Sequence, residues 1–204
     1  MSDAEVEVRQ PSRGLMAMLD PYRGRFAVEG PQGYPVDLFY ARAQTYLEQR
    51  PDLAKCRPET VLVGLLECRK LGLELGSEYH LVPFKDIATG IVDYKGEVKL
   101  IGNAGGTVYA DIVYADDTLS TDQGRLVHTR DLKVDRGGPV GAYAYAILRD
   151  GRSSRVVYMD ADQIQKHIDL SRNPDAQKWW ESWWLKTVVH ELAKWVPWSA
   201  ERAG

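Results

Sequence analysis

The sequence predicts an α+β fold in which a small antiparallel sheet, made of hairpins, is covered by helices. The clearest strand spans residues 140–148, where Val, Ala and Leu on one face alternate with Tyr and Ile on the other, and Asp150-Gly151 then supplies a hairpin turn. Apolar residues at helical spacing mark residues 58–71. The 204 residues, 44% of them hydrophobic and 27% charged, are enough for one domain with a substantial core.

Periodicity and turn residues place the other elements in order. Residues 1–12 are polar and unpatterned, which predicts a disordered N-terminal tail, and a single domain is expected over 13–200. Helices are predicted over 36–49, 58–71, 94–103, 161–170 and 174–196. Strands are predicted over 79–84, 91–94, 107–114, 125–129, 140–148 and 153–159. Gly72 ends the second helix, and Asp160 with Gln163 matches the capping box that begins a helix.

Composition limits the classes of function. The chain has 26 Lys and Arg against 29 Asp and Glu, a net charge of −3, so any nucleic-acid site must gather its cations on one surface. Two cysteines are too few for a disulfide framework. No apolar run approaches the roughly 18 residues of a membrane span, and the polar N-terminus is unlike a signal peptide. These features predict a cytoplasmic protein with no membrane partner.

The final helix carries the most distinctive charge pattern. Lys186, His190 and Lys194 step by four along one face, with Thr187 beside them. Such a row can contact successive phosphates without reading sequence. The alternative is a solvated face over a core formed by Trp180, Trp184, Val188 and Leu192 on the opposite side.

Motifs for enzymatic chemistry are incomplete. His190-Glu191 begins like the zinc peptidase motif H-E-x-x-H, but Lys194 replaces the second ligand, so a metal hydrolase is a minor alternative. The glycine run at 102–106 lacks the lysine and serine of an ATP-binding loop. Aspartates at 111, 116 and 117 could hold a divalent ion, although turn aspartates are usually solvated. The sequence therefore predicts no enzyme, no ATP, no other cofactor and no metal site.

Several blocks resemble a known family in order and spacing. These blocks are LGLELG at 71–76, HLVPF at 80–84, DYKG at 93–96, GAYA at 141–144 and KTVVHELAKWVP at 186–197. Together, over about residues 53–197, they resemble the RecT family of phage and prophage single-strand annealing proteins. The last block departs from the family pattern, because His190 and Glu191 stand where the family has two arginines. A histidine carries charge only below about pH 6.5 unless its surroundings raise the pKa.

The resemblance implies an ATP-independent protein that coats single-stranded DNA and pairs it with a complementary strand. Such proteins form oligomeric rings or helical filaments with DNA in a basic groove, and they recruit a 5′-3′ exonuclease and the host single-strand binding protein through a longer C-terminal region. On this basis we expect the cytoplasm of a bacterial host and a groove lined by Lys85, Lys95, Lys99, Arg130, Lys133, Lys186, His190 and Lys194, with Tyr94 and Thr187 in support. The alternative is an oligomeric scaffold that keeps the fold without annealing, which the acidic balance favours.

Overall fold

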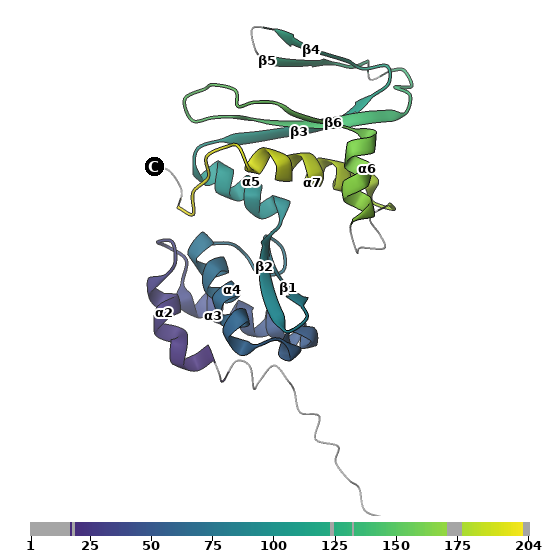
Figure 1. The fold of residues 1–204 in the computed structure, drawn as a ribbon. Helices are drawn as coiled ribbons and strands as arrows, with labels where there is room; N and C mark the ends of the chain where they lie inside the picture. Colours follow the sequence, from purple (N-terminus) through teal and green to yellow (C-terminus); the bar gives the residue numbers. More distant parts are fainter. Residues whose placement is uncertain (1–16, 18, 123–124, 132, 171–176, 202–204) are drawn as a thin grey trace, which may run out of the picture. The chain divides into compact units, whose positions relative to one another are not determined.

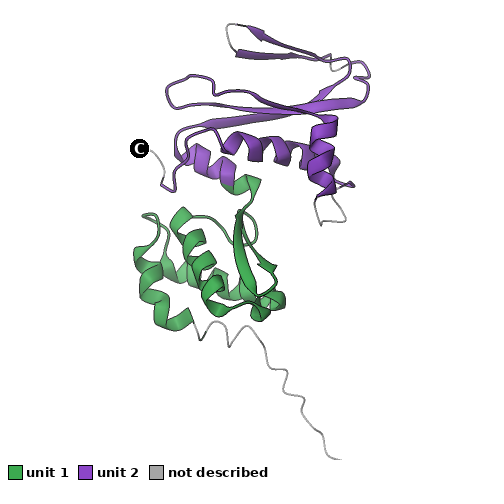
Figure 2. Cartoon of the chain, viewed as in Figure 1, with its two compact units in different colours: residues 1–96 green, residues 97–204 purple. Residues whose placement is uncertain are grey.

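The computed structural model describes residues 17, 19–122, 125–131, 133–170 and 177–201. Contacts divide the chain into two compact units, residues 1–96 and 97–204 (Figures 1 and 2). Helices and small antiparallel sheets confirm the predicted α+β class. The predicted tail at 1–12 lies outside the described residues. The single domain expected over residues 13–200 stays a prediction.

In the described part of the first unit, three helices and two short 3-10 helices pack with a two-stranded hairpin. Its elements are η1 (Asp20–Tyr22), α2 (Arg23–Val28), α3 (Val36–Glu48), η2 (Pro51–Lys55), α4 (Pro58–Leu71), β1 (Tyr79–Phe84) and β2 (Ile87–Val92). The predicted buried face of α4 is confirmed: Val61 and Leu65 are fully enclosed, and the helix packs on β2. Gly72 ends α4 in a left-handed conformation with φ 66°, as the glycine signal predicts.

The β1–β2 hairpin is tighter than the sequence suggests. The second strand was expected at 91–94 after a tip at 85–90, but β2 begins at Ile87, and Phe84 pairs directly with Ile87. The expected tip therefore shrinks to Lys85-Asp86, because Lys85 adopts a left-handed backbone with φ 59° that closes a two-residue turn. Lys85 stands exposed at this turn.

Helix α5 (Tyr94–Asn103) begins where expected, and two features fix its first turn. The Asp93 carboxylate accepts the Lys95 backbone N–H at 3.2 Å, in the manner of an N-cap. A Cβ on Gly96 would lie 2.4 Å from the carbonyl oxygen of Glu78, so only glycine allows the helix to approach this closely. The DYKG block thus specifies the backbone geometry of the first turn of α5.

The second unit is built on the three-stranded antiparallel sheet β3–β6–β7. Its strands are β3 (Thr107–Tyr114), β4 (Thr118–Asp122), β5 (Arg125–Thr129), β6 (Pro139–Ile147) and β7 (Val157–Asp160). Besides α5, its helices are α6 (Ala161–Asp169) and α7 (Trp180–Ala193). Strands β4 and β5 form a separate hairpin on the side of the sheet opposite to α7 (Figure 1). Strand β7 begins four residues later than expected, because the preceding stretch makes only an isolated bridge from Ser153 to Ile147.

The alternation in β6 sets which face α7 covers. Ala142, Ala144 and Ala146 are fully buried, and their small side chains let α7 pack closely on the sheet. Trp184, Val188 and Leu192 form the buried row of α7, as predicted. Tyr143 points to the other face, toward the β4–β5 hairpin, where its hydroxyl lies 3.2 Å from His128 Nδ1.

The ends of the two last helices differ in how well they match expectation. The capping box at the start of α6 is confirmed: the Gln163 N–H donates to Asp160 Oδ1 at 2.8 Å, and the Asp160 N–H donates to Gln163 Oε1 at 3.1 Å. The last helix, expected over 174–196, is shorter than predicted: residues 177–179 form turns, and α7 begins at Trp180 and ends at Ala193. The first residues of the expected helix, 174–176, lie outside the described residues. Within the described ranges, none of the helices combines the length and the apolar character that crossing a bilayer requires.

Candidate nucleic-acid interface

The predicted polar face of α7 combines charged and hydrogen-bonding side chains. Lys186 is half-buried, with Nζ 5.1 Å from the centroid of the Trp183 ring. Thr187 is buried, and its hydroxyl donates to the Trp183 carbonyl at 2.8 Å. Lys194 is exposed and forms an ion pair with Glu191 one turn back. The cationic row therefore exists on the helix, but its last member is already partly neutralised.

A pocket of about 280 Å³ opens between the end of α6 and α7. It is lined by His167, Leu170, Trp183, Lys186, Thr187, His190 and Glu191. Three of these, Lys186, Thr187 and His190, were predicted from the sequence. Ammonium and imidazole groups beside an indole suit a phosphate and the flat face of a base. Sequence reasoning missed Trp183, although its position three residues before Lys186 places it on the same helix face.

His190 links α7 to α5 inside the second unit. Its Nδ1 lies 2.7 Å from Glu97 Oε2. That oxygen is buried and has no aligned hydrogen-bond partner among the described residues, so the contact is a close charge pair only when the imidazole is protonated. Glu97 was missed because nothing in the local pattern predicts which helix faces His190. The pair lowers the positive charge that His190 can offer to a phosphate.

The other predicted lysines lie on exposed turns and helix faces. Lys85, at the hairpin tip, and Lys95, in the first turn of α5, belong to the first unit, as does the half-buried Tyr94. Lys99 is exposed one turn further along α5, within the second unit. Because Lys95 and Lys99 are four residues apart, they share one side of the helix.

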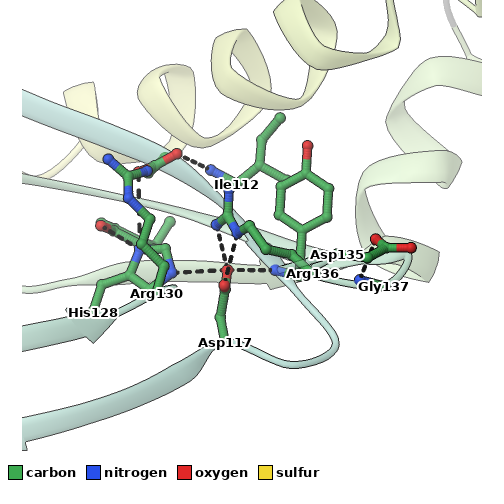
Figure 3. Close-up of polar contacts among 10 residues, drawn as sticks. Ile112, Asp117, His128, Arg130, Asp135, Arg136 and Gly137 are labelled. Atoms are coloured by element: carbon green, nitrogen blue, oxygen red, sulfur yellow. Dashed lines mark hydrogen bonds and ion pairs between the residues drawn. The ribbon is translucent and has the colours of Figure 1, made fainter. Parts of the chain in front are cut away.

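Arg130 lies away from the face that α7 covers. Arg130 Nη1 donates to Asp111 Oδ2 at 2.7 Å (Figure 3). Asp111 pairs in register with Tyr143, on the sheet face toward the β4–β5 hairpin. The sheet therefore separates Arg130 from the cations of α7 within one copy of the chain. Lys133 is exposed on the loop after β5, where its backbone N–H donates to Asp131 Oδ1 at 2.9 Å.

Asp117 anchors the β4–β5 hairpin through a buried charge network (Figure 3). Its side chain is 1% exposed and accepts from Arg136 Nε at 2.8 Å, from the Tyr114 N–H at 2.9 Å and from His128 Nε2 at 2.9 Å. The hydrogen bonds from Arg136 are the main cause that holds the pKa of Asp117 well below its usual range. The expectation of a solvated turn aspartate is wrong here, because Arg136 folds back over the turn.

The residues that could ligate a metal ion are spread over the described chain. Across the described ranges, no three His, Cys, Asp or Glu side chains gather as a set that could hold an ion. His190 and Glu191 each contact a different charged residue, Glu97 and Lys194. The two side chains that begin like a zinc motif are therefore used in ion pairs.

The geometry describes an α+β protein with cationic side chains beside aromatic ones on helix α7. The chain matches the sequence model of the RecT family over residues 38–204, and it belongs to that family. It is 30% identical to Protein RecT of Escherichia coli (strain K12) over 179 residues, covering 78% of this chain and 65% of that relative. The chain thus spans about two thirds of the relative's length. The resemblance drawn from the sequence blocks is confirmed.

Proposed function

We propose that this chain binds single-stranded DNA and anneals complementary strands during homologous recombination, without ATP and without covalent chemistry. The observation that carries the proposal is the pocket shared by Lys186, Thr187 and His190, which lies within the last block of the family resemblance. Membership of the RecT family over residues 38–204 supports it.

In this proposal, cations hold the DNA backbone and leave the bases open for pairing. Lysine contacts to phosphates release condensed counterions, which drives binding at low salt. Lys85, Lys95 and Lys99 make further phosphate contacts, as Lys186, His190 and Lys194 do, while Tyr94 and Thr187 supply stacking or hydrogen bonds. Annealing accelerates because bound strands are concentrated and extended.

The proposal includes assembly into an oligomeric ring or filament, with DNA in a groove that runs across subunits. Arg130 lies on the far side of the sheet from α7, so it would contact a different stretch of DNA or a neighbouring copy, and Lys133 follows on the loop after β5. We further propose action in a phage context within the bacterial cytoplasm, with a 5′-3′ exonuclease and the host single-strand binding protein as partners.

The test is annealing of two fluorescently labelled complementary oligonucleotides without ATP, at low and moderate salt. Lys95→Ala and Lys186→Ala should each slow annealing and reduce the salt slope of single-strand binding by about 0.7, the value for one lost phosphate contact. Lys70→Ala is the matched control, because Lys70 is an exposed lysine at the end of α4 outside the proposed surface. Unchanged affinity and slope in both variants would show that the groove is placed wrongly.

A second candidate is an oligomeric scaffold that keeps the fold without annealing. The ion pairs Lys194–Glu191, Arg130–Asp111 and His190–Glu97 favour it, because each neutralises a cation that DNA would need. A scaffold would form oligomers yet show no salt-dependent binding to single strands and no acceleration of annealing.

A further inference from the structure

A second surface of the 97–204 unit combines exposed tryptophans with arginines. Trp195 is 61% exposed and Trp198 is 58% exposed, both just beyond the end of α7. Indole rings of this size usually bury most of their surface, so two exposed rings close together in the chain suggest a binding role. We call these rings and the nearby Arg149, Arg152 and Arg155 the Trp–Arg surface. It is separate from the pocket between α6 and α7.

The fold holds this surface on a fixed backbone. The segment after α7 lies along α5, where the Ser199 N–H donates to the Leu100 carbonyl at 3.0 Å and Asn103 Nδ2 donates to the Ser199 carbonyl at 3.2 Å. Pro197 from this segment lines a pocket of about 330 Å³ together with Arg149 and Arg152. The rings are therefore presented by a tethered segment.

The arginines come from the turn between β6 and β7. Gly151, with φ 80°, forms the turn, and its N–H donates to the Leu148 carbonyl at 2.8 Å. The stem of Arg149 packs against Gly105, where an added Cβ would lie 3.0 Å from Arg149 Cβ. This packing directs the turn toward the end of α5 and toward the segment that follows α7.

One arginine of this surface lies directly over a tryptophan ring. The Arg155 guanidinium lies 4.4 Å from the centroid of the Trp195 ring, and the Trp195 residue as a whole is 61% exposed. Arg152 pairs with Asp150 at 2.7 Å. By residue type, residues 149–155 carry three arginines and Asp150, and the segment after α7 carries the exposed Glu201, so cationic residues outnumber acidic ones here within a chain whose net charge is −3.

We propose that the Trp–Arg surface is a second contact for single-stranded DNA, with arginines on phosphates and Trp195 and Trp198 stacked on bases. This inference rests on the proposed function, because it assumes that single-stranded DNA is the ligand. The chemistry favours that ligand: exposed π-faces accept any base, and guanidinium groups beside them neutralise the backbone on either side. A strand held at the α6–α7 pocket would reach this surface only when it is long enough, so the contact extends the binding site.

The test measures binding of matched variants of the full chain to labelled oligo-dT by fluorescence polarisation. Two lengths are used, about 8 and about 30 nucleotides, because a typical single-strand site covers roughly 4–16 nucleotides. Trp198→Leu should weaken binding to the long oligonucleotide by about tenfold, the low end for the loss of one base–aromatic stack, with an unchanged salt slope. Arg155→Gln should instead lower the salt slope by about 0.7.

The matched controls are Trp179→Leu and Lys178→Gln. Trp179 is also 58% exposed, and Lys178 lies over its ring at 5.3 Å, so this pair reproduces the chemistry at the other end of α7. Equal loss in control and test variants, or no loss in Trp198→Leu and Arg155→Gln, would overturn the inference while leaving the proposed function intact. Failure of the unmodified chain to bind either oligonucleotide would overturn both.

Discussion

Replacement of the buried carboxylate at Asp117 tests how the β4–β5 hairpin is attached to the sheet. Asp117→Asn keeps an oxygen that can accept the Tyr114 N–H, but it removes the charge that faces Arg136 and His128. Removing one partner of a buried ion pair costs about 3–5 kcal/mol. Because the Arg136 side chain is 21% exposed and stays partly solvated, we expect the lower end, about 3 kcal/mol.

Urea unfolding followed by tryptophan fluorescence is the appropriate assay. All six tryptophans lie between residues 179 and 198, so the signal reports on the second unit. Asp116→Asn is the control, since Asp116 is exposed in the same turn, and it should change the free energy of unfolding by less than about 0.5 kcal/mol. A double-mutant cycle with Arg136→Met should give a coupling of about 2 kcal/mol.

The pH dependence gives an independent check on the same carboxylate. The pKa of Asp117 is lower in the folded state than the value of about 3.9 expected after unfolding. As pH falls below about 4, the unfolded chain therefore binds the proton first, and the stabilisation present above that pH is lost. The deficit of Asp117→Asn should be full at pH 7 and shrink near pH 3. A deficit under 0.5 kcal/mol at pH 7, or one that stays constant with pH, would refute the reasoning.

Four further substitutions test the first unit, helix α5 and the capped helix α6. Gly96→Ala places a Cβ 2.4 Å from the Glu78 carbonyl oxygen and should destabilise the protein by about 2 kcal/mol. Gly102→Ala, in the same helix, meets nothing within 4 Å and should stabilise it by up to about 1 kcal/mol. Unfolding followed by circular dichroism measures both changes. Arg69→Met should cost less than about 1 kcal/mol in urea unfolding, because Arg69 is only 3% exposed and its Nη1 lacks a hydrogen-bond partner among the described residues. A larger loss would mean that the contacts of the guanidinium outweigh the cost of burying its charge. Asp160→Ala should lower the free energy of unfolding by about 1 kcal/mol through loss of the capping box, and an unchanged urea midpoint would contradict this.

The matched blocks mostly specify backbone geometry, which explains why they are readable in the sequence. Gly72 must adopt φ 66° at the end of α4, and Gly76 has φ 86° in the following turn. Gly96 allows contact with a backbone carbonyl, and the alanines of β6 allow α7 to approach the sheet. Each requirement is local or periodic, so the fold class and most element boundaries could be predicted. The extent of the hairpin tip was predicted wrongly because Lys85 adopts a left-handed backbone conformation that residues other than glycine rarely take.

The sequence by itself determined the fold class, the family and the cationic row on the last helix, because these depend on spacing within one segment. Only the tertiary structure decided which charges meet: Glu97 with His190, Asp111 with Arg130, and Asp117 with Arg136. Such pairs join residues that are distant in sequence, and their partners follow from how strands and helices pack. Charge available to a ligand is a property of the packed surface, and a linear pattern of lysines and arginines does not specify it.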